Sequence, residues 1–250
     1  MGNENTFYGL ISELEKYLEY QRDQGVVRVE VDRSVLDELK NNSVQQTEST
    51  PVPVVEARPV PSDFDSLAAI KESIASCKNC GLCQGRKTTV PGEGNGNSPD
   101  ILFVGEGPGA EEDAQGRPFV GKAGQLLDRM IEAMGYRRED VFITNVVKCR
   151  PPSNRKPLPE EMEMCLPYLR QQIKLIKPKV IVGLGASAME GLLGKPVRIS
   201  RIRGIWQEYE GIRLMPTFHP SYLLRDPSKK KSVWTDLKLV LAELGKEPAA

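Results

Sequence analysis

Several features on which common enzyme classes depend are scarce in this sequence of 250 residues. It contains a single histidine, His219, and no G-x-S-x-G segment, which disfavours a hydrolase built on a serine–histidine–aspartate triad. No apolar run approaches the roughly 18 residues that a membrane span needs. The first ten residues also lack the basic region of a secretory signal. We therefore expect a cytoplasmic protein that does not associate with membranes.

Net charge is absent as well, but the charged residues are unevenly distributed. Residues 1–70 contain 13 acidic and 6 basic residues, whereas the remainder contains 21 acidic and 28 basic residues. A basic body suits a polyanionic partner, and an acidic arm suits solubility or a basic partner. Solvated faces carry similar charges, so this pattern alone leaves the partner open.

Strand-like and helix-like segments alternate from residue 64 onward. Strands are expected at 101–105, 141–147 and 180–185, followed by a hairpin of 206–209 and 212–218. Helices are expected at 67–76, 122–134, 159–176, 186–193 and 233–244. This alternation predicts an α/β fold, a three-layer α/β/α sandwich around a central, mostly parallel four-stranded sheet.

The N-terminal quarter of the chain has a different composition. Residues 1–41 include a stretch with helical spacing and predict a helical arm of unknown role, which we expect to dock an unidentified protein. Residues 42–63 are rich in Pro, Ser and Thr and predict a flexible linker. Residues 64–250 are expected to form one domain, and the protein is expected to be a monomer.

The cysteines are odd in number, which argues against a disulfide framework in a cytoplasmic protein. Cys77 and Cys80 have the spacing of half a metal site, and Cys149 and Cys165 could complete a four-sulfur site for zinc or an iron–sulfur cluster. Cys83 is left over, although its spacing from Cys80 also resembles part of a ferredoxin-type run. The alternative is that Cys149 and Cys165 are ordinary buried cysteines.

The predicted parallel strands end in residues that can carry chemistry. The strand 101–105 continues into a Gly-rich segment with several carboxylates, the second strand ends near Asn145, and the last ends near His219. In open α/β sheets, ligands bind beyond the carboxyl ends of the strands. We therefore expect these strand ends to line a pocket.

Five segments carry a more specific signal when they are read in order. They are Cys77-x2-Cys80-x-Leu82-x3-Arg86, GEGPGAEED from Gly105, Arg117-Pro118-Phe119-Val120-Gly121, Thr144-Asn145-Val146-Val147-Lys148-Cys149-Arg150-Pro151-Pro152, and Phe218-His219-Pro220 through Arg225. Each is weak alone, but the ordered set resembles family 4 uracil-DNA glycosylases from about residue 64 to residue 245. The resemblance implies hydrolysis of the N-glycosidic bond of deoxyuridine in DNA, releasing uracil and leaving an abasic site. It also implies a [4Fe–4S] cluster held by Cys77, Cys80, Cys149 and Cys165.

A glycosylase of this kind must flip the target base into a pocket. Phe119 can supply a stacking face, with a core aromatic as the alternative. Asn145 can read the edge of uracil through one donor and one acceptor, and His219 can stabilise the charge that develops on the departing base. Plain alternatives are a turn-capping Asn and a structural His. Gly105 and Gly107 are expected to form part of the pocket wall.

The group that positions water is less determined. By resemblance, Glu106 and Glu112 would line the site, where a carboxylate can also stabilise a sugar cation. The best-known related families have an aspartate two residues after the strand-end glycine, where this chain has Gly107. Either glutamate could therefore act on the water.

Contacts to DNA are expected from two sets of residues. Pro151 and Ser187 lie in segments that could hold phosphates. Tyr222 and Leu223, with the neighbouring Leu224, could insert into the vacated base stack, and Arg225 could follow the backbone. The alternatives to excision with turnover are a non-catalytic iron–sulfur or zinc DNA-binding module, and a relative that traps uracil-DNA covalently through a second histidine, which this chain lacks.

Overall fold

The computed structural model describes residues 60–61 and 63–249. The predicted arm at 1–41 and most of the predicted linker at 42–63 therefore lie outside the described residues. Within the described part, one sheet contains the strands β1 (Glu93–Gly94), β2 (Ile101–Gly105), β3 (Phe142–Asn145), β4 (Val180–Leu184), β5 (Gln207–Tyr209) and β6 (Ile212–Thr217). Their order across the sheet is β1-β3-β2-β4-β6-β5.

The four inner strands of this sheet, β3, β2, β4 and β6, are mutually parallel. The edge strands β1 and β5 pair antiparallel with their neighbours. The predicted α/β class and mostly parallel sheet are confirmed, and the two edge strands enlarge the sheet from four strands to six. β1 was not predicted, because two residues inside a Gly-rich segment show no alternation.

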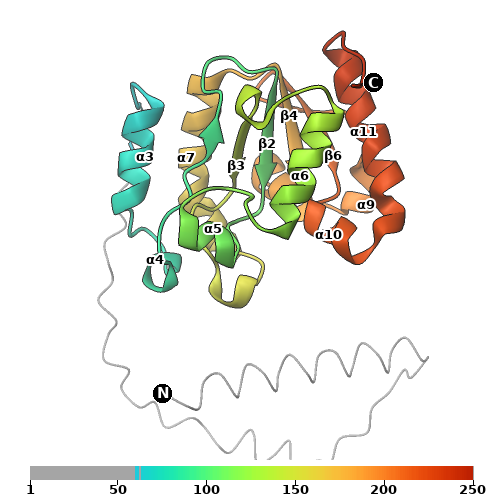
Figure 1. Cartoon of the computed structure of the whole chain (residues 1–250). Coiled ribbons are helices and arrows are strands. Elements are labelled where there is room, and N and C mark those ends of the chain that lie inside the picture. Colours follow the sequence, from blue (N-terminus) through green and yellow to red (C-terminus); the bar gives the residue numbers. More distant parts are fainter. Residues whose placement is uncertain (1–59, 62, 250) are drawn as a thin grey trace, which may run out of the picture. The chain divides into compact units, whose positions relative to one another are not determined.

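Helices cover both faces of the sheet (Figure 1). The helices are α3 (Leu67–Ser76), α4 (Leu82–Gly85), α5 (Ala110–Gln115), α6 (Lys122–Ala133), α7 (Pro159–Ile176), α8 (Ala186–Leu193), α9 (Ile199–Ile202), α10 (Pro220–Arg225) and α11 (Lys230–Glu243). Three short 3-10 turns are η1 (Arg138–Asp140), η2 (Pro152–Asn154) and η3 (Pro227–Lys229). None of the helices in the described part is long and apolar enough to cross a membrane.

The two faces have separate apolar cores, and strand β2 contributes to both. Leu102 and Val104 pack in a cluster with residues of α3, α7 and α8. Ile101 and Phe103 point to the other face and pack with residues of α6, α10 and α11. Because successive side chains of a strand point to opposite faces, a strand buried on both sides reads as a continuous apolar run. This explains why β2 is so easily recognised in the sequence.

The chain order places a crevice at the end of β2. From β2 the chain returns to the sheet on one side as β3, and it then crosses to the other side of β2 as β4. Such a reversal is the point at which doubly wound sheets bind ligands, because the loops beyond the strands diverge there. The fold thus separates the loops that follow β2 and β3 from those that follow β4 and β6.

Candidate active site

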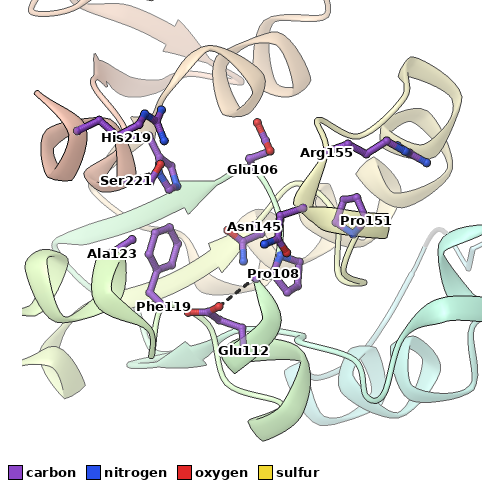
Figure 2. Close-up of a pocket in the computed structure, with 14 residues that line it drawn as sticks. Glu106, Pro108, Glu112, Phe119, Ala123, Asn145, Pro151, Arg155, His219 and Ser221 are labelled. Carbon is purple, nitrogen blue, oxygen red and sulfur yellow. Dashed lines mark hydrogen bonds between the residues drawn. The ribbon is translucent and has the colours of Figure 1, made fainter. Parts of the chain in front are cut away.

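A cavity of about 330 Å³ lies at the carboxyl ends of the parallel strands. Many of the predicted residues line it, as Figure 2 shows for several of them. The predicted residues in its wall are Glu106, Gly107, Glu112, Phe119, Asn145, Pro151, His219 and Arg225. The remaining wall residues are Pro108, Gly109, Ala123, Asn154, Arg155 and Ser221. The structure therefore brings residues from the ends of three strands, β2, β3 and β6, to one cavity.

The ring of Phe119 forms one wall of this cavity. Phe119 is only 5% exposed, and its ring centroid lies 5.5 Å from that of His219. A methyl group at Gly105 would lie 2.5 Å from Phe119 Cζ, so only glycine allows the ring this close to the end of β2. Phe119 also has φ 52°, a left-handed conformation that costs a bulky residue roughly 1–3 kcal/mol. The surroundings therefore hold the ring in place against a local preference.

Asn145, the last residue of β3, presents an unpaired amide oxygen. The residue is 1% exposed, and its Oδ1 atom is buried without a hydrogen-bond partner among the described residues. A buried polar atom without a partner costs about 1–3 kcal/mol, and such atoms are rare in folded proteins. An acceptor kept unpaired at a cavity wall is positioned for a donor on a ligand.

Lys148 holds the end of β3 from the inside of the protein. Its buried Nζ atom donates hydrogen bonds to Thr144 Oγ1 at 2.7 Å, to the Asn145 carbonyl at 2.6 Å and to Gln172 Oε1 at 2.7 Å. Burial lowers the Lys148 pKa to about 8, although the nearby Cys165 opposes this shift. The lysine was not singled out in the sequence, because a lysine after a strand is usually exposed.

His219 is fixed as a hydrogen-bond donor toward the cavity. The backbone N–H of Ser221 donates to His219 Nδ1 at 3.1 Å, so this nitrogen is unprotonated and the proton of the neutral ring lies on Nε2. Burial and then the positive charge of Arg225 lower the pKa of His219 to about 4, against an opposing effect of Glu112. A methyl group at Gly185 would lie 3.0 Å from His219 Cβ, so the absence of a side chain after β4 lets His219 lie this close to the end of that strand.

The two candidate glutamates are bound differently. Glu112 Oε1 accepts hydrogen bonds from the backbone N–H groups of Val120 at 2.8 Å and Gly121 at 2.9 Å. Its Oε2 accepts one from Gly109 at 3.1 Å. The half-buried Glu106 carboxylate also lines the cavity and has no hydrogen-bond or ionic partner among the described residues. Glu106 is therefore the carboxylate that is free to bind water.

The predicted DNA contacts fall into two groups. Pro151 and Arg225 line the cavity, and Tyr222 is half-buried with its ring 5.0 Å from Phe218. Ser187 is buried in the first turn of α8.

Leu223, which is predicted to insert into a base stack, would have to leave the core to do so. Leu223 is 1% exposed and packs in the core under α10. Its neighbour Leu224 is 44% exposed and is the apolar side chain of that helix that can reach a ligand. The six-residue helix α10 is too short for its inward side to be recognised from periodicity.

All five cysteines line a second, small cavity. Arg86 Nη1 donates to Cys149 Sγ at 3.0 Å, and the backbone N–H of Lys148 donates to Cys165 Sγ at 3.3 Å. Among the described residues no group of three or more His, Cys, Asp or Glu side chains is arranged to hold a metal ion. An all-sulfur set surrounding a cavity, with donors aimed at two of the sulfurs, nevertheless has the chemistry that soft metals and iron–sulfur clusters require.

Burial raises the pKa of Cys80 to about 11 and that of Cys165 to about 12. Without a bound metal, the thiols at these two positions are protonated at neutral pH. Ligation must therefore displace the protons, as it does at other thiolate sites.

Known proteins with similar sequences point to one family. The family model of the uracil DNA glycosylase superfamily matches residues 91–238. A type-4 uracil-DNA glycosylase of Thermotoga maritima is 48% identical over 185 residues, which are 72% of this chain and 96% of the relative. The chain belongs to the type-4 uracil-DNA glycosylases. The family expected from the ordered motifs is thus confirmed.

Further relatives of the same type extend this comparison. The type-4 uracil-DNA glycosylase of Sulfurisphaera tokodaii is 47% identical over 186 residues, 71% of this chain and 84% of the relative. That of Archaeoglobus fulgidus is 42% identical over 192 residues, 74% of this chain and 96% of the relative. The residues matched by the family model include every residue named above in the cavity wall and exclude Cys77 and Cys80.

Proposed function

We propose that this chain is a DNA-repair enzyme that hydrolyses the N-glycosidic bond of deoxyuridine in DNA, releasing uracil and leaving an abasic site. The buried, unpaired Oδ1 of Asn145 is the observation that carries this proposal. It lies in a cavity that also contains a stacking ring, a fixed imidazole donor and a free carboxylate. Family membership supports the same reaction.

Uracil and cytosine differ at the edge that Asn145 faces. Uracil presents N3–H and a carbonyl oxygen at C4, which match an amide oxygen and an amide N–H. Cytosine presents an unprotonated N3 and an amino group, so both contacts to the amide become unfavourable. Sites that read polar groups by hydrogen bonding reject the wrong ligand strongly, because their own buried groups are left unpaired.

His219 stabilises the base as it leaves. Cleavage places negative charge on O2 and N1 of uracil, and a donor fixed at the oxygen lowers the barrier. With a pKa near 4 the ring is neutral at pH 7, and its Nε2–H serves as that donor without prior protonation. Phe119 holds the base plane beside the imidazole.

Glu106 positions the water that attacks the sugar carbon. Its carboxylate is free, so it can accept a proton from water and stabilise the positive charge on the sugar. Glu112 instead fixes the backbone around Phe119 through its three accepted hydrogen bonds.

The cysteine-lined cavity would hold a [4Fe–4S] cluster through Cys77, Cys80, Cys149 and Cys165, with Cys83 unused. When bound, the cluster supplies cross-links between distant segments rather than redox chemistry. These four residues lie beside α3 and α4, in the loop after β3, and in α7. The arrangement therefore ties the start of the domain to the loop that follows Asn145.

DNA binds across the mouth of the active-site cavity. Pro151 and Arg225 line that cavity, and Tyr222 and the exposed Leu224 lie on the same short helix as Arg225. The basic excess of residues 71–250 suits this polyanion.

The experiment that tests the function uses a labelled oligonucleotide with one uracil. The purified protein is incubated with the single-stranded and the duplex form, and the DNA is then treated with hot alkali. We expect strand cleavage at the uracil position, and none in a matched oligonucleotide with thymine there. Uracil-independent binding without alkali-labile sites in either form would instead identify a non-catalytic DNA-binding module.

A further inference from the structure

We propose that Arg138, which lies outside the cavity wall, is a positioning residue that holds Phe119 in its left-handed backbone conformation for stacking on the base. The proposal rests on the excision activity proposed above only for its kinetic test. The carbonyl groups of Pro118 and Phe119 accept hydrogen bonds from Arg138 Nη2 and Nη1. Of the described residues that line the cavity, Phe119 is the only one to which Arg138 donates a hydrogen bond.

The loop around Phe119 is gripped from two sides. On one side, the Glu112 carboxylate accepts hydrogen bonds from the backbone N–H groups of Val120 and Gly121. On the other side, Arg138 binds the carbonyl of Phe119 at 3.1 Å. A backbone conformation that a bulky residue disfavours persists only where its surroundings fix it, and these two grips fix the peptide groups on both sides of the ring.

Arg138 is itself held rigidly, so it can act as a fixed point. Its Nε and Nη2 atoms donate to Glu93 at 2.9 and 2.8 Å, and its Nη1 donates to Asp128 at 2.6 Å. With the two carbonyls of Pro118 and Phe119, these contacts use all five N–H groups of the guanidinium. The side chain is only 22% exposed. A lysine, with three donors on a single nitrogen, cannot reproduce the arrangement.

Phe119 packs closely against two neighbouring elements, so a shift of its loop would change both contacts. A methyl group at Gly124 would collide with the carbonyl group of Phe119, so helix α6 lies directly against this peptide. The ring itself lies against Gly105. Removing Arg138 would free two carbonyls and leave Glu93 and Asp128 without their shared cation, and the loop would relax toward ordinary backbone angles.

The test is a double-mutant cycle between Arg138→Met and Phe119→Gly, measured as single-turnover rates on uracil-DNA. Glycine removes both the ring and the backbone preference. We expect Arg138→Met to slow excision about 10- to 100-fold when Phe119 is present, since misplacement by about 1 Å can cost 100-fold. In the Phe119→Gly background the same change should cost less than about twofold. Arg137→Met is the matched control, because the Arg137 side chain is 74% exposed and, among the described residues, forms ion pairs with Glu139 and Asp140 of the same turn.

Equal losses in both backgrounds, or no loss with Phe119 present, would overturn the proposal. A readout independent of activity is a crystal structure of Arg138→Lys, the milder variant, which also serves if Arg138→Met does not fold. We expect the φ angle of Phe119 to leave the left-handed region or its ring to leave the cavity wall. A ring and φ angle unchanged in that variant would contradict the inference, even if wild-type protein failed to excise uracil.

Discussion

The cavity lined by Asn145 and the cavity lined by Cys149 are joined by one short segment of chain, residues 145–149, yet only the first contains buried or half-buried polar groups that lack a partner among the described residues. In the first, the Asn145 amide oxygen and the Glu106 carboxylate have no partner among the described residues. In the second, Arg86 and a backbone N–H donate to sulfur atoms. Unpaired groups suit a ligand that comes and goes, whereas partnered sulfurs suit a permanent occupant.

Lys148 joins the two cavities. Its backbone N–H points to Cys165, and its side chain holds the Asn145 carbonyl. The two cavities are therefore connected through one residue, and substitutions in each should show whether their roles differ. The largest expected effect comes first.

Replacing one proposed ligand should remove the permanent occupant. Cys165→Ser is expected to lose iron and visible absorption and to lower the melting temperature by roughly 10 °C, since each kcal/mol corresponds to about 2–4 °C at this size. Cys83→Ser, which alters the same cavity, is the control and should retain iron. Iron content and the melting temperature are measured for both variants. Equal iron loss in the two variants would show that Cys83 is a ligand.

Within the base pocket, substitution of one glutamate should lower the excision rate, and substitution of the other should lower the stability of the fold. Glu106→Gln is expected to slow excision by about 10²–10⁴-fold at unchanged melting temperature, because it removes the group that activates water. Glu112→Gln should instead destabilise the fold by about 1–3 kcal/mol through its weakened backbone contacts. Single-turnover rates and thermal melts distinguish them. A Glu106→Gln enzyme of normal rate would exclude that residue as the water-positioning group.

His219→Ala should slow excision about 10²–10³-fold, the usual loss when one donor to a developing anion is removed. Ser221→Ala is a mild control, because the Ser221 backbone N–H that fixes the ring tautomer remains. The comparison is made on single-turnover rates with saturating enzyme. Wild-type cleavage by His219→Ala would place the leaving-group donor elsewhere.

Asn145→Asp should change selectivity more than stability. A protonated carboxyl group can donate to N3 of cytosine, which the amide oxygen repels, so the uracil-to-cytosine rate ratio should fall at least about 10-fold. Rates on matched oligonucleotides that contain uracil or cytosine measure the ratio. An unchanged ratio would mean that another group reads the base edge.

The smallest effect concerns pH. The pKa of His219 is about 4 in the fold and about 6.5 in the unfolded chain, so the unfolded chain binds more protons between these values. Stability should therefore fall as the pH is lowered from about 6.5 to about 4 and be insensitive to this group above 6.5. In His219→Gln this part of the decline should vanish. Urea unfolding at several pH values tests it, and identical slopes in both proteins would refute the lowered pKa.

The sequence predicted the layers and the inner strands because parallel strands buried on two faces are uninterrupted apolar runs, as in Ile101–Gly105. It did not predict β1, which is only two residues long, or α10, whose six residues begin at Pro220. The inward side of α10 was hidden for the same reason, and this explains why the burial of Leu223 was not foreseen.

Polar side chains at strand ends could also be recognised in the sequence, since Asn145 is the last residue of β3 and His219 lies just after β6. Side chains that contact backbone groups could not. Arg138 binds carbonyls and two carboxylates far along the chain, and Lys148 is buried although lysine is usually exposed. The preference for Glu106 over Glu112 likewise depends on which carboxylate accepts hydrogen bonds in the fold. The sequence around the two residues does not show this.

The central claim is most directly tested by quantifying free base and DNA product together. Wild-type protein is incubated with a uracil-containing oligonucleotide, and free uracil, abasic sites and protein–DNA adducts are measured in the same samples. We expect one uracil released per abasic site, more than one turnover per protein, and no adduct on a denaturing gel. Abasic sites trapped in a stable adduct, or DNA bound with no uracil released, would contradict it.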